Sequence, residues 1–215
     1  MTGRAAADTI SSLDGIVAVS HETSEKLEAF VGLLRRWQTA ENLISPKTLP
    51  EIWTRHVADS AELVRLFPEA GVWLDLGSGG GFPGIVVALV GARGTHVHLV
   101  ESNARKCAFL RTAIRVTGAP ATIHEGRAEA IIENWERPVD RISARAVAGL
   151  TRLLNLAEPL MAKGVPAAFQ KGEDFRREIA EASQSFDFDL VEHRSRVGEG
   201  VILDIANLRR KPRQT

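Results

Sequence analysis

Apolar side chains recur at helical spacing in the first third of the chain. In residues 24–38 they fall three and four positions apart, and Thr23 or Ser24 is suited to cap such a helix. A second segment, residues 49–66, also carries apolar residues along one side. These spacings predict helices without strands over residues 1–70.

After Gly71 the pattern changes to short apolar runs that do not alternate with polar residues. Five of these runs are each followed by a segment long enough for a helix, and they span residues 72–76, 96–100, 121–124, 139–142 and 165–169. Buried strands that alternate with helices form a parallel sheet covered on both faces. The last two runs, 187–193 and 201–208, are joined by a link too short for a parallel crossover, which predicts an antiparallel hairpin.

The order of these elements predicts an α/β fold with a mostly parallel seven-stranded sheet and an antiparallel C-terminal hairpin. This layout is typical of the class I methyltransferase fold, whereas a full dinucleotide-binding Rossmann domain has a different strand arrangement. We therefore expect a helical N-terminal extension over residues 1–70 and a cofactor-binding domain over residues 71–215.

Composition narrows the class of protein. The 215 residues include 27 basic and 27 acidic side chains, so the formal net charge is zero. The single cysteine, Cys107, excludes an internal disulfide and a multi-cysteine zinc cage, and we expect no metal site. The N-terminus lacks a signal-peptide pattern, and no apolar run reaches the roughly 18 residues that span a membrane, so we expect a soluble, cytoplasmic protein.

Two basic stretches stand out in this neutral chain. Residues 102–117 contain no acid, and the second stretch is the tail from Leu208 onward. Their basic side chains are Arg105, Lys106, Arg111 and Arg115 in the first stretch and Arg209, Arg210, Lys211 and Arg213 in the second. Such patches bind nucleic acid, while a solvated helix face and a frayed tail are the alternatives.

A glycine-rich loop, LDLGSGGGFPG over residues 74–84, follows the first predicted strand. Glycines let a ligand lie against the backbone, and open α/β sheets bind ligands at the carboxyl ends of their strands. Gly79, Gly81 and Gly84 match the dinucleotide fingerprint, which is a weak signal on its own. Asp75, two residues before Gly77, repels a pyrophosphate but suits the positively charged S-adenosylmethionine. The loop therefore favours S-adenosyl-L-methionine over a nicotinamide cofactor.

Two further acidic positions belong to this predicted cofactor site. Glu101 ends the second predicted strand, where a carboxylate can accept hydrogen bonds from both ribose hydroxyls. Ala128 and Glu129 follow the third strand, in the loop that faces the adenine in this fold. An ordinary helix N-terminus, at which acids are favoured, is the alternative interpretation of Glu129.

Four sequence blocks together resemble one known family. They are Asn42-Leu43-Ile44-Ser45, His56-Val57-Ala58-Asp59-Ser60, the loop ending Gly81-Phe82-Pro83-Gly84, and Ser143-Ala144-Arg145-Ala146. The chain is similar over most of its length to the bacterial 16S rRNA guanine-N7 methyltransferases, also called glucose-inhibited division protein B. Where the family often has Asn-Leu-Thr, this chain has Asn42-Leu43-Ile44-Ser45.

The resemblance implies methyl transfer from S-adenosylmethionine to N7 of a guanine in the 530 loop of 16S rRNA, by convention nucleotide 527. It implies 16S rRNA or the small ribosomal subunit as partner and no membrane partner. It also implies cofactor contacts at five positions, which are Gly77, Phe82, Ala128, Glu129 and Arg145. Asp75, Gly79 and Glu101 join this set from the general logic of the fold.

The expected chemistry agrees with motifs that the sequence lacks. No Asp/Asn-Pro-Pro-Tyr/Phe block, which methyltransferases acting on exocyclic amines usually carry, follows the fourth predicted strand. Cys107 lies on a predicted helix and suits a core position better than a nucleophile's role. Guanine N7 presents a lone pair without deprotonation, so we expect no catalytic base. Arg145 is expected to position the reactants, a surface ion pair being the alternative.

Five other side chains are candidates for the site or for binding the RNA. His56 and Asp59 lie one helical turn apart. They are either site residues over the cofactor or a buried capping pair that anchors the N-terminal helices. Lys171, after the fifth predicted strand, is a candidate phosphate contact, and Arg111 and Arg115 are candidate RNA contacts.

Two rival functions stay open at the level of sequence. One is a small-molecule methyltransferase in which the N-terminal helices form a lid, and the other is a binding module without turnover. The oligomeric state, the assembly state of the RNA and the residue that grips the guanine are also open.

Overall fold

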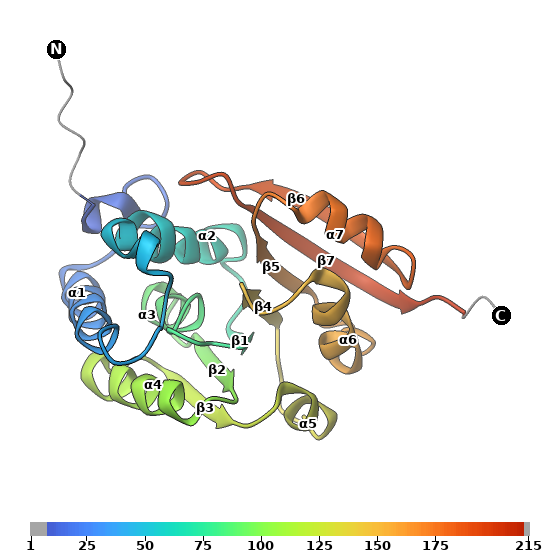
Figure 1. Ribbon diagram of the computed structural model, residues 1–215, viewed down its shortest axis with the longest axis horizontal. Coiled ribbons are helices and arrows are strands. Elements are labelled where there is room, and N and C mark those ends of the chain that lie inside the picture. Colours follow the sequence, from blue (N-terminus) through green and yellow to red (C-terminus); the bar gives the residue numbers. More distant parts are fainter. Residues whose placement is uncertain (1–7, 213–215) are drawn as a thin grey trace, which may run out of the picture.

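A computed structural model describes residues 8–212 of the chain (Figure 1). It has one seven-stranded sheet in the order β3-β2-β1-β4-β5-β7-β6. The strands are β1 Val72–Leu76, β2 His96–Glu101, β3 Ala121–Glu125, β4 Arg141–Arg145, β5 Ala167–Lys171, β6 Phe186–Arg194 and β7 Val201–Arg210. β1 to β5 run parallel, and β7 pairs antiparallel with both β5 and β6. The predicted α/β fold with its antiparallel hairpin is confirmed.

Strands β4 and β5 begin two residues later than the apolar runs predict. The side chain of Asp140 accepts hydrogen bonds from the amides of Gly71 (2.9 Å) and Val72 (2.7 Å), so it closes the turn before β4. Pro166 precedes β5, and a proline has no amide hydrogen to donate to a neighbouring strand. Both strands instead extend through polar residues to their carboxyl ends, at Arg145 and Lys171.

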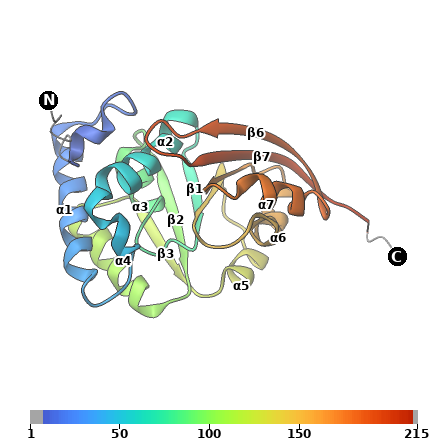
Figure 2. The same ribbon diagram turned by 45° about the horizontal axis from the view of Figure 1, so that its top comes forward.

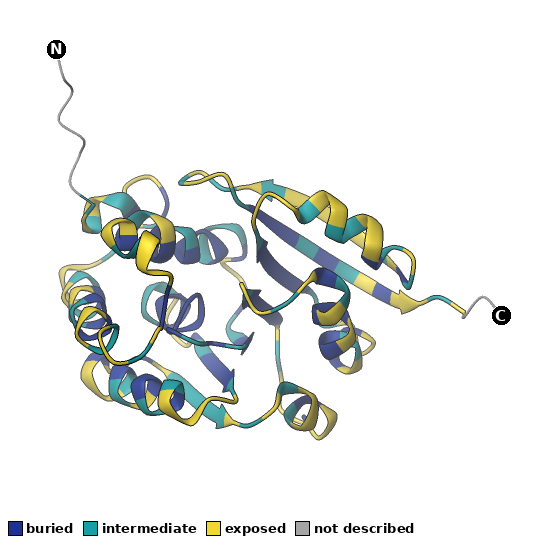
Figure 3. Ribbon diagram, in the orientation of Figure 1, coloured by how far each residue is buried: buried dark blue, intermediate teal, exposed yellow. Residues whose placement is uncertain are grey.

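The helices lie on both faces of the sheet (Figures 1 and 2). They are α1 His21–Trp37, α2 Asp59–Leu66, α3 Gly84–Val90, α4 Ala104–Thr117, α5 Ala128–Glu133, α6 Leu150–Met161 and α7 Phe175–Ala182. Helices α1 to α4 share one hydrophobic core with Trp73 and Leu99, while α6 packs in a second core with Leu74 and Leu76. Because neighbouring residues of a strand point to opposite faces, β1 contributes to both cores. Buried positions accordingly follow the strands and the inner helix faces (Figure 3).

The cap of α1 differs from the prediction. Ser20, rather than Thr23 or Ser24, precedes the helix, and its hydroxyl accepts a hydrogen bond from the amide of Thr23 at 3.1 Å. The first turn of α1 is polar and half-exposed, so the apolar spacing that marks the helix begins only at Leu27.

The segment predicted as one helix over residues 49–66 consists of three pieces. They are a 3₁₀ turn at Pro46–Glu51, a π-helical turn at Trp53–Ala58 and α2. Pro50 has no amide hydrogen for a regular helix, and the carboxylate of Asp8 accepts hydrogen bonds from the amides of Trp53 (2.8 Å) and Thr54 (2.9 Å). π-helical turns occur frequently at functional sites, and this one contains His56.

Among the described residues, no helix combines the length and the apolar character that a membrane span requires. The carboxyl ends of the parallel strands β1 to β5 meet at one edge of the sheet, and the loops that follow them form the site.

Candidate cofactor and substrate site

The glycine-rich loop folds tightly over the end of β2. The amides of Gly77 (2.8 Å) and Ser78 (3.0 Å) donate to the carbonyl of Val100. Gly77 has a φ of 67°, which is costly for other residues, and a Cβ there would come 2.6 Å from the Val147 side chain. At Gly80 a Cβ would lie 2.9 Å from the carbonyl oxygen of Leu43. The loop therefore requires glycine where the N-terminal segment and the β4–α6 loop approach it.

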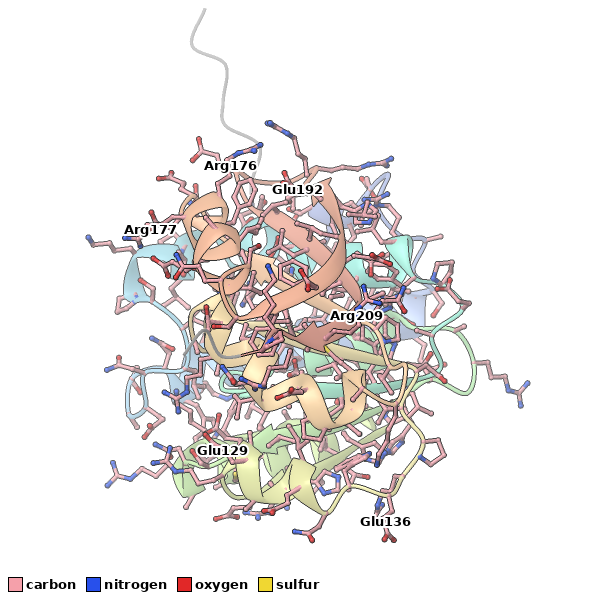
Figure 4. The ribbon with its side chains drawn as sticks, turned by 90° about the vertical axis from the view of Figure 1, so that its right-hand side faces the viewer. Glu129, Glu136, Arg176, Arg177, Glu192 and Arg209 are labelled. Atoms are coloured by element: carbon pink, nitrogen blue, oxygen red, sulfur yellow. The ribbon has the colours of Figure 1, made fainter. Side chains whose placement is uncertain are left out.

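A cavity of about 860 Å³ opens in front of this loop. It lies at the carboxyl edge of the sheet, and segments from the Asn42–Thr48 region form part of its wall. The residues on its wall that the sequence predicts as site residues are His56, Gly77, Gly79, Phe82, Glu101, Ala128, Glu129 and Arg145. Glu129, labelled in Figure 4, lies in the first turn of α5. The cavity does not include Asp75, Lys171, Arg111 or Arg115.

Glu101 holds two loops of the cavity together. One carboxylate oxygen accepts from the amide of Gly79 at 2.9 Å, and the other accepts from the amide of Asn103 at 2.7 Å. A carboxylate has about four lone-pair positions, so acceptor capacity remains on both oxygens. The side chain lies at the end of β2, on the cavity wall, as the sequence predicts.

Asp75 lies beneath the glycine loop, away from the cavity wall. Its carboxylate is fully buried and accepts a hydrogen bond from the hydroxyl of Ser143 at 2.9 Å. Burial raises the pKa of Asp75 to about 6, against the opposing effect of its hydrogen bonds to Ser78 and Ser143. The structure thus places this acid under the loop, where it supports the loop from the opposite side to the cavity.

Arg145 joins the N-terminal region to the end of β4. One terminal guanidinium nitrogen lies 2.5 Å from Nδ1 of His56, and the other donates to the carbonyl of Arg55 (3.0 Å) and to Oδ2 of Asp59 (3.4 Å). The Arg145 guanidinium also lies over the ring of Phe82, 5.1 Å from its centre. Burial lowers the pKa of Arg145, and the charge of Asp59 opposes that effect. These contacts make Arg145 the central side chain of the site.

The contact with Arg145 determines the protonation of His56. An arginine has no hydrogen-bond acceptor, so Nδ1 of His56 must accept and Nε2–H donates to the hydroxyl of Thr48 at 2.8 Å. Burial, together with the charges of Arg145 and Arg55, lowers the pKa of His56 to about 3. His56 is therefore a neutral imidazole with both nitrogens occupied.

Comparison with known proteins identifies the family. The family model described as rRNA small subunit methyltransferase G matches residues 23–200. A protein named Ribosomal RNA small subunit methyltransferase G from Bradyrhizobium sp. (strain ORS 278) is 46% identical over 209 residues, covering 96% of this chain and 94% of that protein. Its namesake from Brucella abortus (strain S19) is 50% identical over 204 residues, with coverages of 93% and 95%.

The chain belongs to the rRNA small subunit methyltransferase G family.

Solved structures agree with this fold. The structure of an O-methyltransferase from Bacillus cereus in complex with SAH matches with a TM-score of 0.56 at 15% identity, covering 92% of this chain and 95% of that chain. A methyltransferase from Geobacter sulfurreducens matches with a TM-score of 0.59 at 15% identity, covering 91% and 93%. These likenesses establish the class I methyltransferase fold for this member of the methyltransferase G family, and the family resemblance of the sequence is confirmed.

A second cavity of about 460 Å³ adjoins the first one in this methyltransferase G chain. Arg145, Ala146 and Val147 line both cavities. Ala146 has a φ of 54°, an unusual value for a residue with a side chain, and such strain is common at functional sites. Asp59 lines the second cavity only.

Lys171 lies in this second cavity and is already paired. Its ammonium group lies 2.6 Å from the carboxylate of Glu178 and donates to the carbonyl of Ala148 at 2.7 Å. The same Glu178 oxygen accepts from the amide of Leu150 at 2.6 Å, at the start of α6. The pair therefore holds the β4–α6 loop, which forms the wall shared by the two cavities.

Apart from Lys106, which lines the larger cavity, the basic side chains of the two stretches that the structure describes lie outside both cavities. On α4, Arg111 pairs with Glu125 at 2.5 Å, and Arg115 is exposed without an ion pair among the described residues. In the tail, Arg210 pairs with Glu158, while Arg209 is exposed near the end of β7 (Figure 4). Arg213 lies outside the described residues.

Sequence reasoning missed two residues that shape the site. Thr48 holds the tautomer of His56, and Gln170 donates to both the carbonyl and Oδ2 of Asp59 at 2.8 Å. Gln170 and Asp59 are 111 positions apart, so no local pattern could reveal their contact. Only Gln170 could have been suspected from the sequence, because it directly precedes the candidate Lys171 at the end of a predicted strand.

Proposed function

We propose that this chain transfers a methyl group from S-adenosylmethionine to N7 of a guanine in 16S rRNA, at nucleotide 527 of the 530 loop. Membership of the methyltransferase G family supports an rRNA acceptor. The observation that carries the proposal is the larger cavity, which joins the glycine loop and Glu101 to Arg145 and a neutral His56. A substrate of this kind, 16S rRNA or the small ribosomal subunit, would be met in the cytoplasm.

The residues of the larger cavity fit S-adenosylmethionine. A volume of about 860 Å³ lies within the range of cofactor pockets. Glu101 retains acceptor capacity for the two ribose hydroxyls, and the backbone at Gly77 and Gly79 can lie against the ligand without side-chain collisions. Ala128 and Glu129 would border the adenine, and Asp75 would support the loop from beneath.

The chemistry requires positioning and no proton removal. S-adenosylmethionine supplies an electrophilic methyl group on a positively charged sulfur. Guanine N7 already carries a lone pair, and the neutral His56 has no free nitrogen with which to take a proton. Arg145 holds the approaching base, and orientation of this kind contributes roughly 7–11 kcal/mol in favourable cases. The carboxylate of Asp59 lies beside it and favours the positive charge that N7-methylation creates on the ring.

The position of the new methyl group tests the proposed function. Purified protein is incubated with labelled S-adenosylmethionine and, separately, 30S subunits, naked 16S rRNA and metabolites. We expect label on 16S rRNA, with borohydride reduction and aniline cleaving the chain at one guanine, because only the N7-methylated ring is cationic. Label at an exocyclic amine, at C5 or on a ribose would contradict the proposal, and label on a metabolite alone would favour the small-molecule methyltransferase.

We expect the methyl-transfer rate at saturating cofactor to stay level between about pH 6.5 and pH 8.5. The lowered pKa of His56, about 3, keeps this side chain neutral throughout that range. A histidine with the ordinary pKa of about 6.5 would instead gain a proton at the lower end. Single-turnover rates measured across the range check this expectation.

In the pH experiment, the variant His56→Gln distinguishes the titration of His56 from the titration of a buried carboxyl. The raised pKa of Asp75, about 6, means that this carboxyl takes up a proton as the pH falls through that value. A rate loss below about pH 6 that persists in His56→Gln therefore comes from a buried carboxyl, either Asp75 or Asp59, because burial raises the pKa of Asp59 as well. A loss centred near pH 6.5 that vanishes in His56→Gln would instead show that His56 titrates.

For the RNA surface we propose the exposed side of α4 beside the cavity mouth. Arg115 is exposed there, Arg111 is held by Glu125, and Lys106 borders the larger cavity. Basic side chains in this position would contact phosphates and orient the RNA without reading its sequence.

A further inference from the structure

The second cavity adjoins the cofactor cavity and shares three lining residues with it. Arg145, Ala146 and Val147 form the shared wall, and Gln170, Lys171 and Glu178 line only the second cavity. Its volume of about 460 Å³ is in the lower part of the range for ligand pockets, which suits one flat base better than a large metabolite. Ala146, Val147, Ala148 and Val201 give it apolar surface against which a ring can pack.

Two polar atoms in this cavity have hydrogen-bonding capacity to spare. The hydrogen bonds of Arg145 use its two terminal nitrogens, and its Nε–H has no partner among residues 8–212. Both bonds of the Asp59 carboxylate go to Oδ2, and Oδ1 accepts none from the described part of the chain. Neither Nε of Arg145 nor Oδ1 of Asp59 is sealed away from solvent. Because Arg145 and Asp59 both line the cavity, it offers a hydrogen-bond donor and an acceptor.

We propose that the second cavity receives the target guanine, with Arg145 donating to its O6 and Asp59 accepting from its N1–H. This assignment rests on the proposed function and names the residues that select its base. Proteins that modify or read unpaired nucleotides bind the Watson–Crick edge of a base in this way.

The positions of the donor on Arg145 and the acceptor on Asp59 favour guanine and exclude adenine. Guanine presents an acceptor at O6 next to a donor at N1, which matches Arg145 and Asp59. Adenine presents a donor and then an acceptor at the same two positions, so it would oppose both side chains. Uracil shares the guanine order but has no N7 to receive a methyl group.

The wall shared by the two cavities also determines the orientation of the guanine. O6 and N7 are neighbouring acceptors on guanine. Because Arg145 lines both cavities, a base that accepts from Arg145 through O6 brings N7 to the side of the cofactor cavity. Asp59, which lines only the second cavity, lies on the side of N1.

Gln170 acts as a positioning residue for Asp59. Its amide donates to both the backbone carbonyl and Oδ2 of Asp59 at 2.8 Å, and Arg145 donates to the same Oδ2 at 3.4 Å. These bonds occupy Oδ2 and leave Oδ1 of Asp59 available to accept a hydrogen bond. Lys171 pairs with Glu178 nearby, so among the described residues the cation that contacts Asp59 is Arg145.

The test compares Asp59→Asn with wild-type protein on purified 30S subunits that carry guanine or adenine at the methylated nucleotide. We expect Asp59→Asn to lower kcat/KM on the guanine subunits about 10- to 100-fold, and to reduce the preference for guanine over adenine at least about 10-fold. The affinity for S-adenosylmethionine, measured by calorimetry, should stay within about twofold of wild type. The matched control Asp187→Asn, which alters an exposed acid on β6 that pairs with Lys211, should behave as wild type.

Two outcomes would overturn the assignment. In one, Asp59→Asn methylates the guanine subunits as efficiently as wild type, and in the other it loses rate with an unchanged base preference. If Asp59→Asn does not fold, Gln170→Met takes its place, because it leaves the carboxylate and removes its two amide bonds, and the same shift in base preference is required. Wild-type protein that places no methyl on N7 would refute the proposed function itself, independently of Asp59.

Discussion

Replacing Arg145 by alanine is expected to lower kcat/KM about 100-fold and the free energy of unfolding by about 3 kcal/mol. The guanidinium contacts His56, Asp59 and the carbonyl of Arg55, and it lies over the ring of Phe82. Its loss leaves the largely buried Asp59 without its cation, and breaking such a pair costs about 3–5 kcal/mol when both partners are deeply buried. Both side chains keep some exposure, so we expect the lower end of that range. Single-turnover methyl transfer and urea denaturation measure the two effects.

Two variants serve as controls for that experiment. Arg111→Ala breaks the exposed pair with Glu125 and should change the unfolding free energy by less than about 1 kcal/mol. Arg145→Lys keeps the charge near Asp59, but an ammonium group cannot hold three partners in the planar geometry of a guanidinium. It should therefore recover part of the stability and little of the rate. Arg145→Ala protein with wild-type efficiency would remove Arg145 from the site.

Much of the fold follows from local sequence. Apolar runs of strand length that alternate with helical segments predict the parallel strands, and the short glycine-containing link predicts the β6–β7 hairpin. Because the carboxyl ends of parallel strands share one edge, the positions of Glu101 and Arg145 at strand ends were enough to predict that both line one cavity.

The orientation of Asp75 is less evident from sequence, although its strand contains a clue. Alternation along β1 puts Asp75 on the same face as Trp73, beneath the helices, and Leu74 and Leu76 on the other face. The prediction that Asp75 faces the cofactor rested on its position two residues before Gly77 in the sequence. Alternation along the strand instead buries its side chain beneath the helices. That proposed direct contact is the one for which the burial of the side chain gives least support.

Long-range pairings explain what local patterns could not predict. Lys171 looks like a free cation in sequence, but it pairs with Glu178 from α7 and with the carbonyl of Ala148. Gln170 reaches Asp59 across the junction between the sheet and the N-terminal helices. Such contacts depend on how separate elements pack, which residue spacing does not encode. The second cavity is built from these contacts, and it became visible only in the structure.

The substitution Gly84→Ala is expected to lower the free energy of unfolding by about 3 kcal/mol, although alanine is favoured over glycine within a helix by about 1 kcal/mol. Gly84 begins α3, and a Cβ there would lie 2.7 Å from Oδ2 of Asp75 and would overlap the side chain of Leu99. The fully buried Asp75 cannot yield without losing its bond to Ser143. Urea denaturation measures the loss, and Gly198→Ala, which meets no atom within 4 Å, is the matched control. An unchanged midpoint for Gly84→Ala would show that α3 can move away from β1, and would contradict a rigid support beneath the glycine loop.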